Sequence, residues 1–225
     1  MKKVWFVIVV AALTVFSFNM AFARSIPGIP NELNNGSFED GWTSWHPEGD
    51  IALFDKWGPV SPYNNGTQMV GSAQWNHSGK AYQVVDDTLS PGWNPDYNHK
   101  EVDLSAYVNV QMGSAALDLA YIPIDVYSGD DPPEWNDSRW VDLGIVAQSD
   151  SSQQGWQYIQ YHDILDYQPR WIRVSVDVEA GFHREAFAFV DDVDFESRCV
   201  PLPGAVWLLG SGLIGLLGMR RKQHG

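Results

Sequence analysis

Hydrophobic and polar residues alternate with a period of two along most of the chain, and no stretch repeats its apolar residues at helical spacing. From Trp171 to Val178 every second residue is Ile or Val, and the residues between are mostly polar. Val102 to Gln111 alternates equally well. Because successive side chains of a strand point to opposite faces, each segment is predicted to be a strand with one face in a core.

Seven further segments have the length and composition of strands. They are Ile51–Phe54, Thr67–Ser72, Ala81–Val85, Leu117–Tyr127, Trp140–Ala147, Trp156–Tyr161 and Ala186–Phe195. Turn-forming runs such as Asn64-Asn65-Gly66 and Gln154-Gly155 separate them. About nine short strands predict an all-β sandwich over residues 35–197, with an extended lead-in over residues 24–34.

The N-terminal end has the pattern of a secretory signal peptide. Lys2 and Lys3 precede an apolar run from Val4 to Phe18, and small residues follow up to Ala23. We expect residues 1–23 to form a signal helix that is cleaved after Ala23. The alternative is an uncleaved membrane anchor, for which the run is short against the roughly 20 residues that a span needs.

The C-terminal end, residues 198–225, combines three features. Pro201 and Pro203 precede a short apolar stretch over residues 205–219, and the basic cluster Arg220-Arg221-Lys222 follows. The basic cluster is expected to stay on the cytoplasmic side, which places residues 24–199 outside the membrane. An ordinary C-terminal membrane helix is the alternative interpretation.

These three features, in this order, resemble the PEP-CTERM family of sorting signals in its Val-Pro-Leu-Pro form, although Gly204 stands where Ala is commoner. The resemblance implies a Gram-negative bacterium and processing by an exosortase-type membrane peptidase at the Pro201–Pro203 motif. It also implies transient insertion of the C-terminal helix into the inner membrane. The expected destination is the cell surface or extracellular matrix, in association with exopolysaccharide and biofilm.

The net charge of the chain limits the classes of partner that it can bind. The formal net charge is −14, and all 28 acidic residues lie between the two ends just described. Such a surface repels phosphate backbones, so nucleic acid is not expected as a partner, whereas cations and neutral ligands are compatible with it. A single cysteine, Cys199, rules out a framework of intramolecular disulfides, and the sequence assigns it no role.

Two segments at the ends of the sandwich carry a second resemblance. One is Asn35-Gly36-Ser37-Phe38-Glu39, with Trp42 just beyond, and the other is the closing strand around Asp191-Asp192-Val193. Together they resemble the galactose-binding-like jelly rolls of carbohydrate-binding modules. The resemblance implies a single jelly roll that binds carbohydrate, with Glu39 and Asp191 helping to hold a structural Ca²⁺.

Asp191 is also a candidate metal ligand on its own pattern. It shares parity with Phe189 and Val193, so its side chain is expected to point into the sandwich. A carboxylate buried there needs a partner, and Ca²⁺ takes oxygen ligands of this kind. The alternative is that Asp191 caps a turn or pairs with an arginine.

Exposed aromatic rings are the main indication of a ligand, because flat rings stack on the C–H faces of sugars. Trp42 and Trp45 are assigned to packing, and tryptophans elsewhere are often buried as well. The candidate glycan contacts lie in polar, turn-rich segments or on the polar face of the strand over residues 102–111. They are Trp57, Trp75, Trp93, Tyr97, Tyr107, Asn109, Gln111, Trp135 and Trp140.

No catalytic motif is present: the histidines lack metal-ligand spacing and no nucleophile elbow occurs. The acidic stretch over residues 130–137 does not match a calcium loop and is interpreted as a solvated loop. We therefore expect a non-enzymatic, calcium-stabilised jelly roll that binds polysaccharide. The alternatives are a structural or adhesive matrix protein without a glycan pocket, and a polysaccharide-active hydrolase or lyase.

Overall fold

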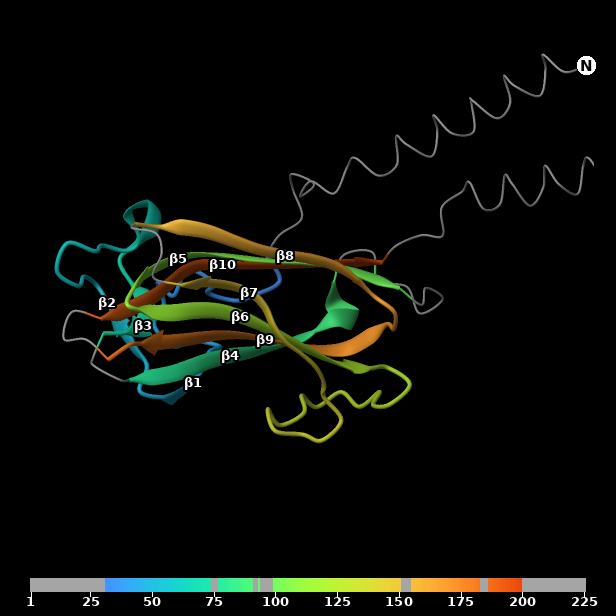
Figure 1. Cartoon of the computed structure of the whole chain (residues 1–225). Helices are drawn as coiled ribbons and strands as arrows, with labels where there is room; N and C mark the ends of the chain where they lie inside the picture. The colour runs from blue at the N-terminus through green and yellow to red at the C-terminus, as the bar shows by residue number, and fades with distance from the viewer. Residues whose placement is uncertain are drawn as a thin grey trace, which may run out of the picture.

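The computed structural model describes residues 31–73, 77–90, 93, 99–150, 155–182 and 186–199. Two five-stranded antiparallel sheets pack face to face (Figure 1). The first sheet has the order β1 (His46–Gly49), β4 (Ser78–Asp86), β9 (Pro169–Ala180), β6 (Gly113–Pro123) and β7 (Val141–Asp150). The second has the order β2 (Ala52–Phe54), β3 (Met69–Ser72), β10 (Phe187–Cys199), β5 (Lys100–Gln111) and β8 (Gln157–Leu165). Two 3₁₀ turns, Tyr63–Asn65 and Asp87–Leu89, are the helical elements within these residues.

The expected all-β sandwich is confirmed, and each of the nine expected strands overlaps an observed one. β1 was not expected. Its sequence, His-Pro-Glu-Gly, contains Pro47, which cannot donate a ladder hydrogen bond, and Gly49, which weakens a strand interior. β1 lies at an edge of the first sheet, where proline is tolerated, and pairs only with β4.

The core lies between the sheets. On β9, Ile172, Val174 and Val176 are wholly buried, as the alternation predicts. β5 contributes its apolar alternate residues to the same core. Trp45 is 3% exposed and donates from Nε1 to the carbonyl oxygen of Asn35 at 2.9 Å, so its assignment to packing is confirmed. Trp42 packs against the same core.

A second, smaller cluster lies on the other side of β10, around Phe187 and Phe189. Phe54, Trp57 and Trp156 pack against it. The segment between β2 and β3 therefore covers part of the outer side of the second sheet.

A β-bulge in β10 changes the expected direction of Asp191. Asp191 pairs with Tyr107 and Asp194 pairs with Ser105, so β10 contains one extra residue there. Asp192, in this interval, has a φ of 46°. The bulge reverses the parity, so Val193 packs in the core between the sheets whereas Phe189 packs on the outer side. Asp191 is buried as expected, but on the outer side of the second sheet rather than inside the sandwich.

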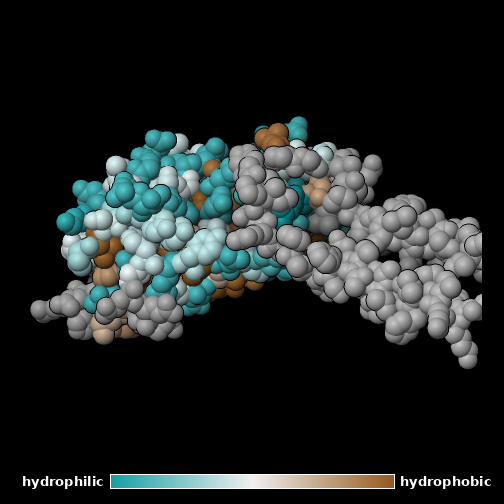
Figure 2. Space-filling view, turned by 90° about the horizontal axis from the view of Figure 1, so that it is seen from above, coloured by the Kyte–Doolittle hydropathy of each residue, from teal (hydrophilic) through white to brown (hydrophobic). Residues whose placement is uncertain are grey.

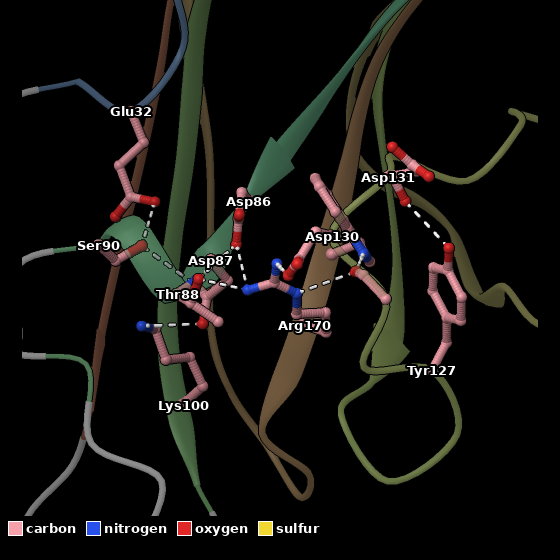
Figure 3. A network of polar contacts seen from close by, with 12 residues as sticks. Glu32, Asp86, Asp87, Thr88, Ser90, Lys100, Tyr127, Asp130, Asp131 and Arg170 are labelled. Carbon is pink, nitrogen blue, oxygen red and sulfur yellow. Dashed lines mark hydrogen bonds and ion pairs between the residues drawn. The ribbon is translucent and has the colours of Figure 1, made fainter.

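Polar side chains connect the sheets at the end where β4 leads into β5 (Figure 3). Asp87, in the turn after β4, accepts a hydrogen bond from Ser197 Oγ at 2.7 Å and forms an ion pair with Lys100. Glu32 accepts from Ser90 Oγ at 2.6 Å and from the backbone N–H of Ser197 at 2.8 Å. This network therefore joins the beginning of the described chain to its end.

The two ends of the described fold lie side by side. The N–H of Glu32 donates to the carbonyl oxygen of Phe195 at 2.8 Å, and Asn31 Nδ2 donates to that of Val193 at 2.8 Å. The chain therefore enters and leaves the sandwich at one place.

The signal peptide with its cleavage site after Ala23, most of the lead-in, and the tail with Pro201 and Pro203 lie outside the described residues. Trp75 and Tyr97 also lie outside them. Among the residues that are described, no helix has the length and apolar character needed to cross a membrane.

Candidate functional site

The outer surface of the first sheet gathers polar and aromatic side chains. Side chains of β9 alternate between the two faces of the sheet. Val174 and Val176 point into the core, so Arg173 and Asp177 point outward. The loop between β6 and β7 lies over this surface, beneath the lower sheet in Figure 1. We call the surface the first-sheet face; its residues are His46, Glu48, Lys80, Tyr82, Asp118, Trp135, Trp140, Asp142, Arg173 and Asp177.

Three aromatic rings line one part of this face. The ring of Tyr82 lies 5.1 Å from that of His46 in a stacked arrangement. The Tyr82 ring also lies 6.1 Å from the ring of Trp135, at an interplanar angle of 37°. Trp135 is 36% exposed. The rings therefore form an angled, accessible corner rather than a single flat platform.

Arg173 fixes the loop that supplies the tryptophans. Its Nη1 donates a hydrogen bond to the carbonyl oxygen of Trp135, and its guanidinium carbon lies 5.3 Å from the ring centroid of Trp140. Asp142 Oδ2 lies 3.7 Å from Nη2 of the same side chain. Trp140 Nε1 donates to the carbonyl oxygen of Glu134 at 2.8 Å, which holds the loop together internally.

The face is hollowed in two places that adjoin along β1 and β4. A hollow of about 520 Å³ lies between the aromatic corner, with His46, Tyr82 and Trp135, and the loop. A second, of about 400 Å³, is lined by polar groups including Glu48 and Lys80. His46 pairs with Tyr82 and Glu48 with Lys80 in the same ladder, so the two hollows follow one another along the strands. Their succession suits an extended ligand.

Carboxylates provide hydrogen-bond acceptors on this face. Burial raises the pKa of Asp118, and the neighbouring charges of Asp142 and Asp177 raise it further. Burial also raises the pKa of Asp177, although Lys80 and Arg173 oppose this. The buried Oδ1 of Asp118 accepts no hydrogen bond from any residue that the structure describes.

The two carboxyl pKa values move in the same direction. Burial is the first cause of the rise for both Asp118 and Asp177. The first-sheet face combines aromatic surface, acceptors and donors, which is the chemistry needed to hold a polyhydroxylated ligand.

The structure divides the candidate glycan contacts between two opposite surfaces. Trp135 and Trp140 lie on the first-sheet face. The others that are described, apart from Trp93, belong to the second sheet or the segment that covers it; they are Trp57, Tyr107, Asn109 and Gln111. Trp93 is half-buried and donates its backbone N–H to the carbonyl oxygen of Ser90.

Tyr107 and Asn109 are less available than their sequence positions predict. The ring of Tyr63 stacks on that of Tyr107 at a centroid distance of 3.5 Å. Asn109 is only 6% exposed. The segment that follows β2 therefore occupies the polar face of β5, on which the sequence predicted a glycan surface.

Sequence reasoning missed Tyr82, Arg173 and Asp177 as members of a site. The alternation along β9 already placed Arg173 and Asp177 on its polar face. What the sequence lacked was the pairing of β9 with β4 and the position of the loop around Trp135.

Asp191 and Glu39, the expected calcium ligands, influence one another. The oxygens of Asp191 accept hydrogen bonds from the N–H groups of Tyr63 at 2.7 Å and Asp192 at 2.8 Å. Burial, together with the negative charges of Asp192 and Glu39, raises the pKa of Asp191 to about 7. Glu39 accepts from the N–H of Thr67 at 2.7 Å. Both carboxylates thus hydrogen-bond to the segment between β2 and β3.

Asp191 forms no ion pair with a lysine or arginine among the described residues. A buried carboxylate without a cationic partner is costly, so a bound Ca²⁺ fits the residues present.

The acidic loop over residues 130–137 is organised by ion pairs. Asp137 accepts hydrogen bonds from the backbone N–H and from Nε of Arg139, both at 2.9 Å. These hydrogen bonds lower the pKa of Asp137 to about 2. Asp130 Oδ1 lies 3.2 Å from Arg170 Nη2. Two of the negative charges of the loop are therefore paired with arginines.

No protein-family model and no curated protein matches the sequence. Among solved structures, the chain is similar to TmCBM61 in complex with β-1,4-galactotriose, with a TM-score of 0.46 and 17% identity over 74% of this chain and 97% of that one. It is also similar to a xylan-binding CBM22-1 domain from Paenibacillus barcinonensis, with a TM-score of 0.44 and 12% identity over 79% and 100% of the two chains. A family 16 carbohydrate-binding module gives 0.45 and 14% over 73% and 99%. None of these reaches a TM-score of 0.5.

Proposed function

We propose that the chain is an exported, non-enzymatic protein whose first-sheet face binds polysaccharide. The observation that carries the proposal is the corner formed by His46, Tyr82 and Trp135 beside a hollow of about 520 Å³. Aromatic rings offer a surface for the C–H groups of a sugar ring, and their low rotamer freedom limits the entropy lost on binding.

The polar groups around the corner complement sugar hydroxyls. Lys80 Nζ lies 5.5 Å from the ring centroid of Trp135 and can donate. The carboxylates of Glu48 and Asp177, which line the second hollow, can accept. Two successive hollows give room for more than one sugar residue along β1 and β4.

Ca²⁺ held with the help of Glu39 and Asp191 belongs to the proposal as a stabilising ion. The first-sheet face lies on the other sheet, so the ion would tie β10 to the segment after β2 without touching the ligand. Delivery to the surface or matrix by an exosortase-type peptidase, with transient membrane insertion, rests on the two ends of the sequence.

The test is a binding screen with the full chain against neutral and charged polysaccharides, followed by calorimetry on any that bind. Trp135→Ala should weaken binding at least tenfold, because it removes the exposed ring of the corner. Tyr158→Ala is the matched control, since Tyr158 is an exposed aromatic residue of the second sheet. Equal loss in both variants, or saturable binding to none of the polysaccharides, would contradict the proposal and favour a structural matrix protein.

A further inference from the structure

A second cluster of charged groups lies on the outer side of the second sheet, away from the first-sheet face. Figure 2 looks onto this side, which is mostly hydrophilic. Asp103 of β5 and His162 of β8 are directly paired across the ladder, and Glu101 lies two residues from Asp103 on the same side of β5. The strands therefore bring one imidazole and two carboxylates together.

The distances within this group are short. His162 Nδ1 lies 2.7 Å from Asp103 Oδ1, and His162 Nε2 lies 3.5 Å from Glu101 Oε1. One ligand atom from each of the three residues falls within 4.8 Å of the other two. The side chains of His162 and Asp103 are 30% and 29% exposed, so an ion can reach them from solvent.

The charges around the group are not balanced. Arg198 is the cation of the cluster, with Nη2 2.5 Å from Glu101 Oε1 and 3.5 Å from Asp103 Oδ2. Asp194 and Glu196 add two carboxylates nearby, and each feels the negative charge of Asp103. Four carboxylates thus face one guanidinium, and a divalent cation would reduce their mutual repulsion.

We propose that Glu101, Asp103 and His162 bind one divalent first-row transition ion, of which Zn²⁺ is the representative. Zinc accepts imidazole nitrogen and carboxylate oxygen at about 2.0–2.2 Å, and three protein ligands with a water complete a tetrahedron. The imidazole distinguishes this group from a calcium or magnesium site, because both of those ions select oxygen ligands.

Arg198 can remain in place when the ion binds. Its Nε donates to Glu101 Oε2 at 2.6 Å and its Nη2 donates to Oε1 at 2.5 Å, and Oε1 is also the oxygen nearest His162. Oε1 has a second lone pair for the ion, while the two hydrogen bonds from Arg198 keep the carboxylate oriented, as outer-shell partners of metal ligands do. The ion would link the edge strand β8 to β5.

The test is calorimetric titration of the chelator-treated full chain with Zn²⁺. We expect one site per chain, and His162→Asn should weaken it at least tenfold. His77→Asn is the matched control. His77 also faces a carboxylate, with Nδ1 3.4 Å from Asp50 Oδ2, but among the described residues it belongs to no group of three potential metal ligands. His77→Asn should leave the site unchanged.

Two further measurements keep the test decisive. Co²⁺ should give the visible absorption of a tetrahedral site in the wild-type chain and lose it in Asp103→Asn, which serves if His162→Asn fails to fold. Millimolar Ca²⁺ should not displace the ion. Absence of Zn²⁺ binding, or equal binding by the wild-type and His162→Asn or Asp103→Asn chains, would overturn the proposal.

Discussion

The ammonium nitrogen of Lys100 lies 3.0 Å from Oδ2 of Asp87, and neither side chain has any solvent exposure. Asp87 follows the last strand residue of β4 in the first sheet, whereas Lys100 begins β5 in the second. Removing one partner leaves an uncompensated buried charge, so Lys100→Met should lower the free energy of unfolding by roughly 3–5 kcal/mol. Urea unfolding followed by tryptophan fluorescence measures this.

The double replacement Lys100→Met with Asp87→Leu is the control for that prediction. It removes both charges together and should recover most of the lost stability, since a hydrophobic pair of similar volume often replaces a buried ion pair at little cost. A single variant as stable as the wild-type chain would show that the pair contributes nothing.

The pH dependence of stability should report on Asp191. Its pKa is raised from an ordinary value of 3.8 to about 7 in the fold, so between those values the folded chain binds more protons than the unfolded chain. Without a bound cation, the contribution of Asp191 to stability should therefore fall as the pH rises through this window. The whole effect is no more than roughly 4 kcal/mol.

Asp191→Asn tests this directly, because an amide does not titrate. In the presence of chelator, the variant should lose this part of the pH dependence and be more stable than the wild-type chain at pH 8. Thermal melts of both chains between pH 4 and pH 8 provide the comparison. If the melting temperatures of the two chains changed with pH in the same way, the raised pKa of Asp191 would be refuted.

Calcium should make the wild-type chain more stable than Asp191→Asn, which is the reverse of the order expected with chelator. A cation held with the help of Asp191 and Glu39 stabilises the folded state by mass action, so millimolar Ca²⁺ should raise the melting temperature of the wild-type chain by several degrees. Asp191→Asn and Glu39→Gln should respond much less. No shift with Ca²⁺ in the wild-type chain would rule out the proposed ion.

Gly71 should tolerate no side chain. A Cβ atom at this position would lie 2.4 Å from the carbonyl oxygen of Ala188 and 2.3 Å from the ring of Phe189. Relief would require β3 and β10 to separate, so Gly71→Ala should cost about 1–3 kcal/mol of stability. Gly144→Ala, at a position with φ of 68° and no atom within 4 Å of the added Cβ, separates backbone strain from a clash.

Much of the fold could be predicted because alternation is a local property. β9 and β5 present apolar residues at every second position, and burial of those residues is what the sandwich needs. The bulge at Asp192 could not be predicted in this way. It adds one residue without changing the composition, and so Phe189 and Asp191 lie on the outer side although Val193 and Phe195 point into the core as parity predicts.

The candidate site was harder to predict than the fold because its residues meet only through long-range pairing. Trp135 was selected for its polar surroundings, but Tyr82 lies in a strand and carries no local sign of its neighbour. Lys100 illustrates the same limit in the interior. A lysine at the start of a strand reads as a solvated residue until its ion pair with Asp87 is known.

The proximity of Asn31 and Glu32 to Val193 and Phe195 has a mechanical consequence. A force that pulls the two chain ends apart would act at one place and would load these hydrogen bonds in succession, as in a zipper. The ends would peel away at low force, before the ladders of β4, β9 and β6 carried any load. If the sandwich were tethered through either end, the force would act at that point, and the first-sheet face would carry no tension.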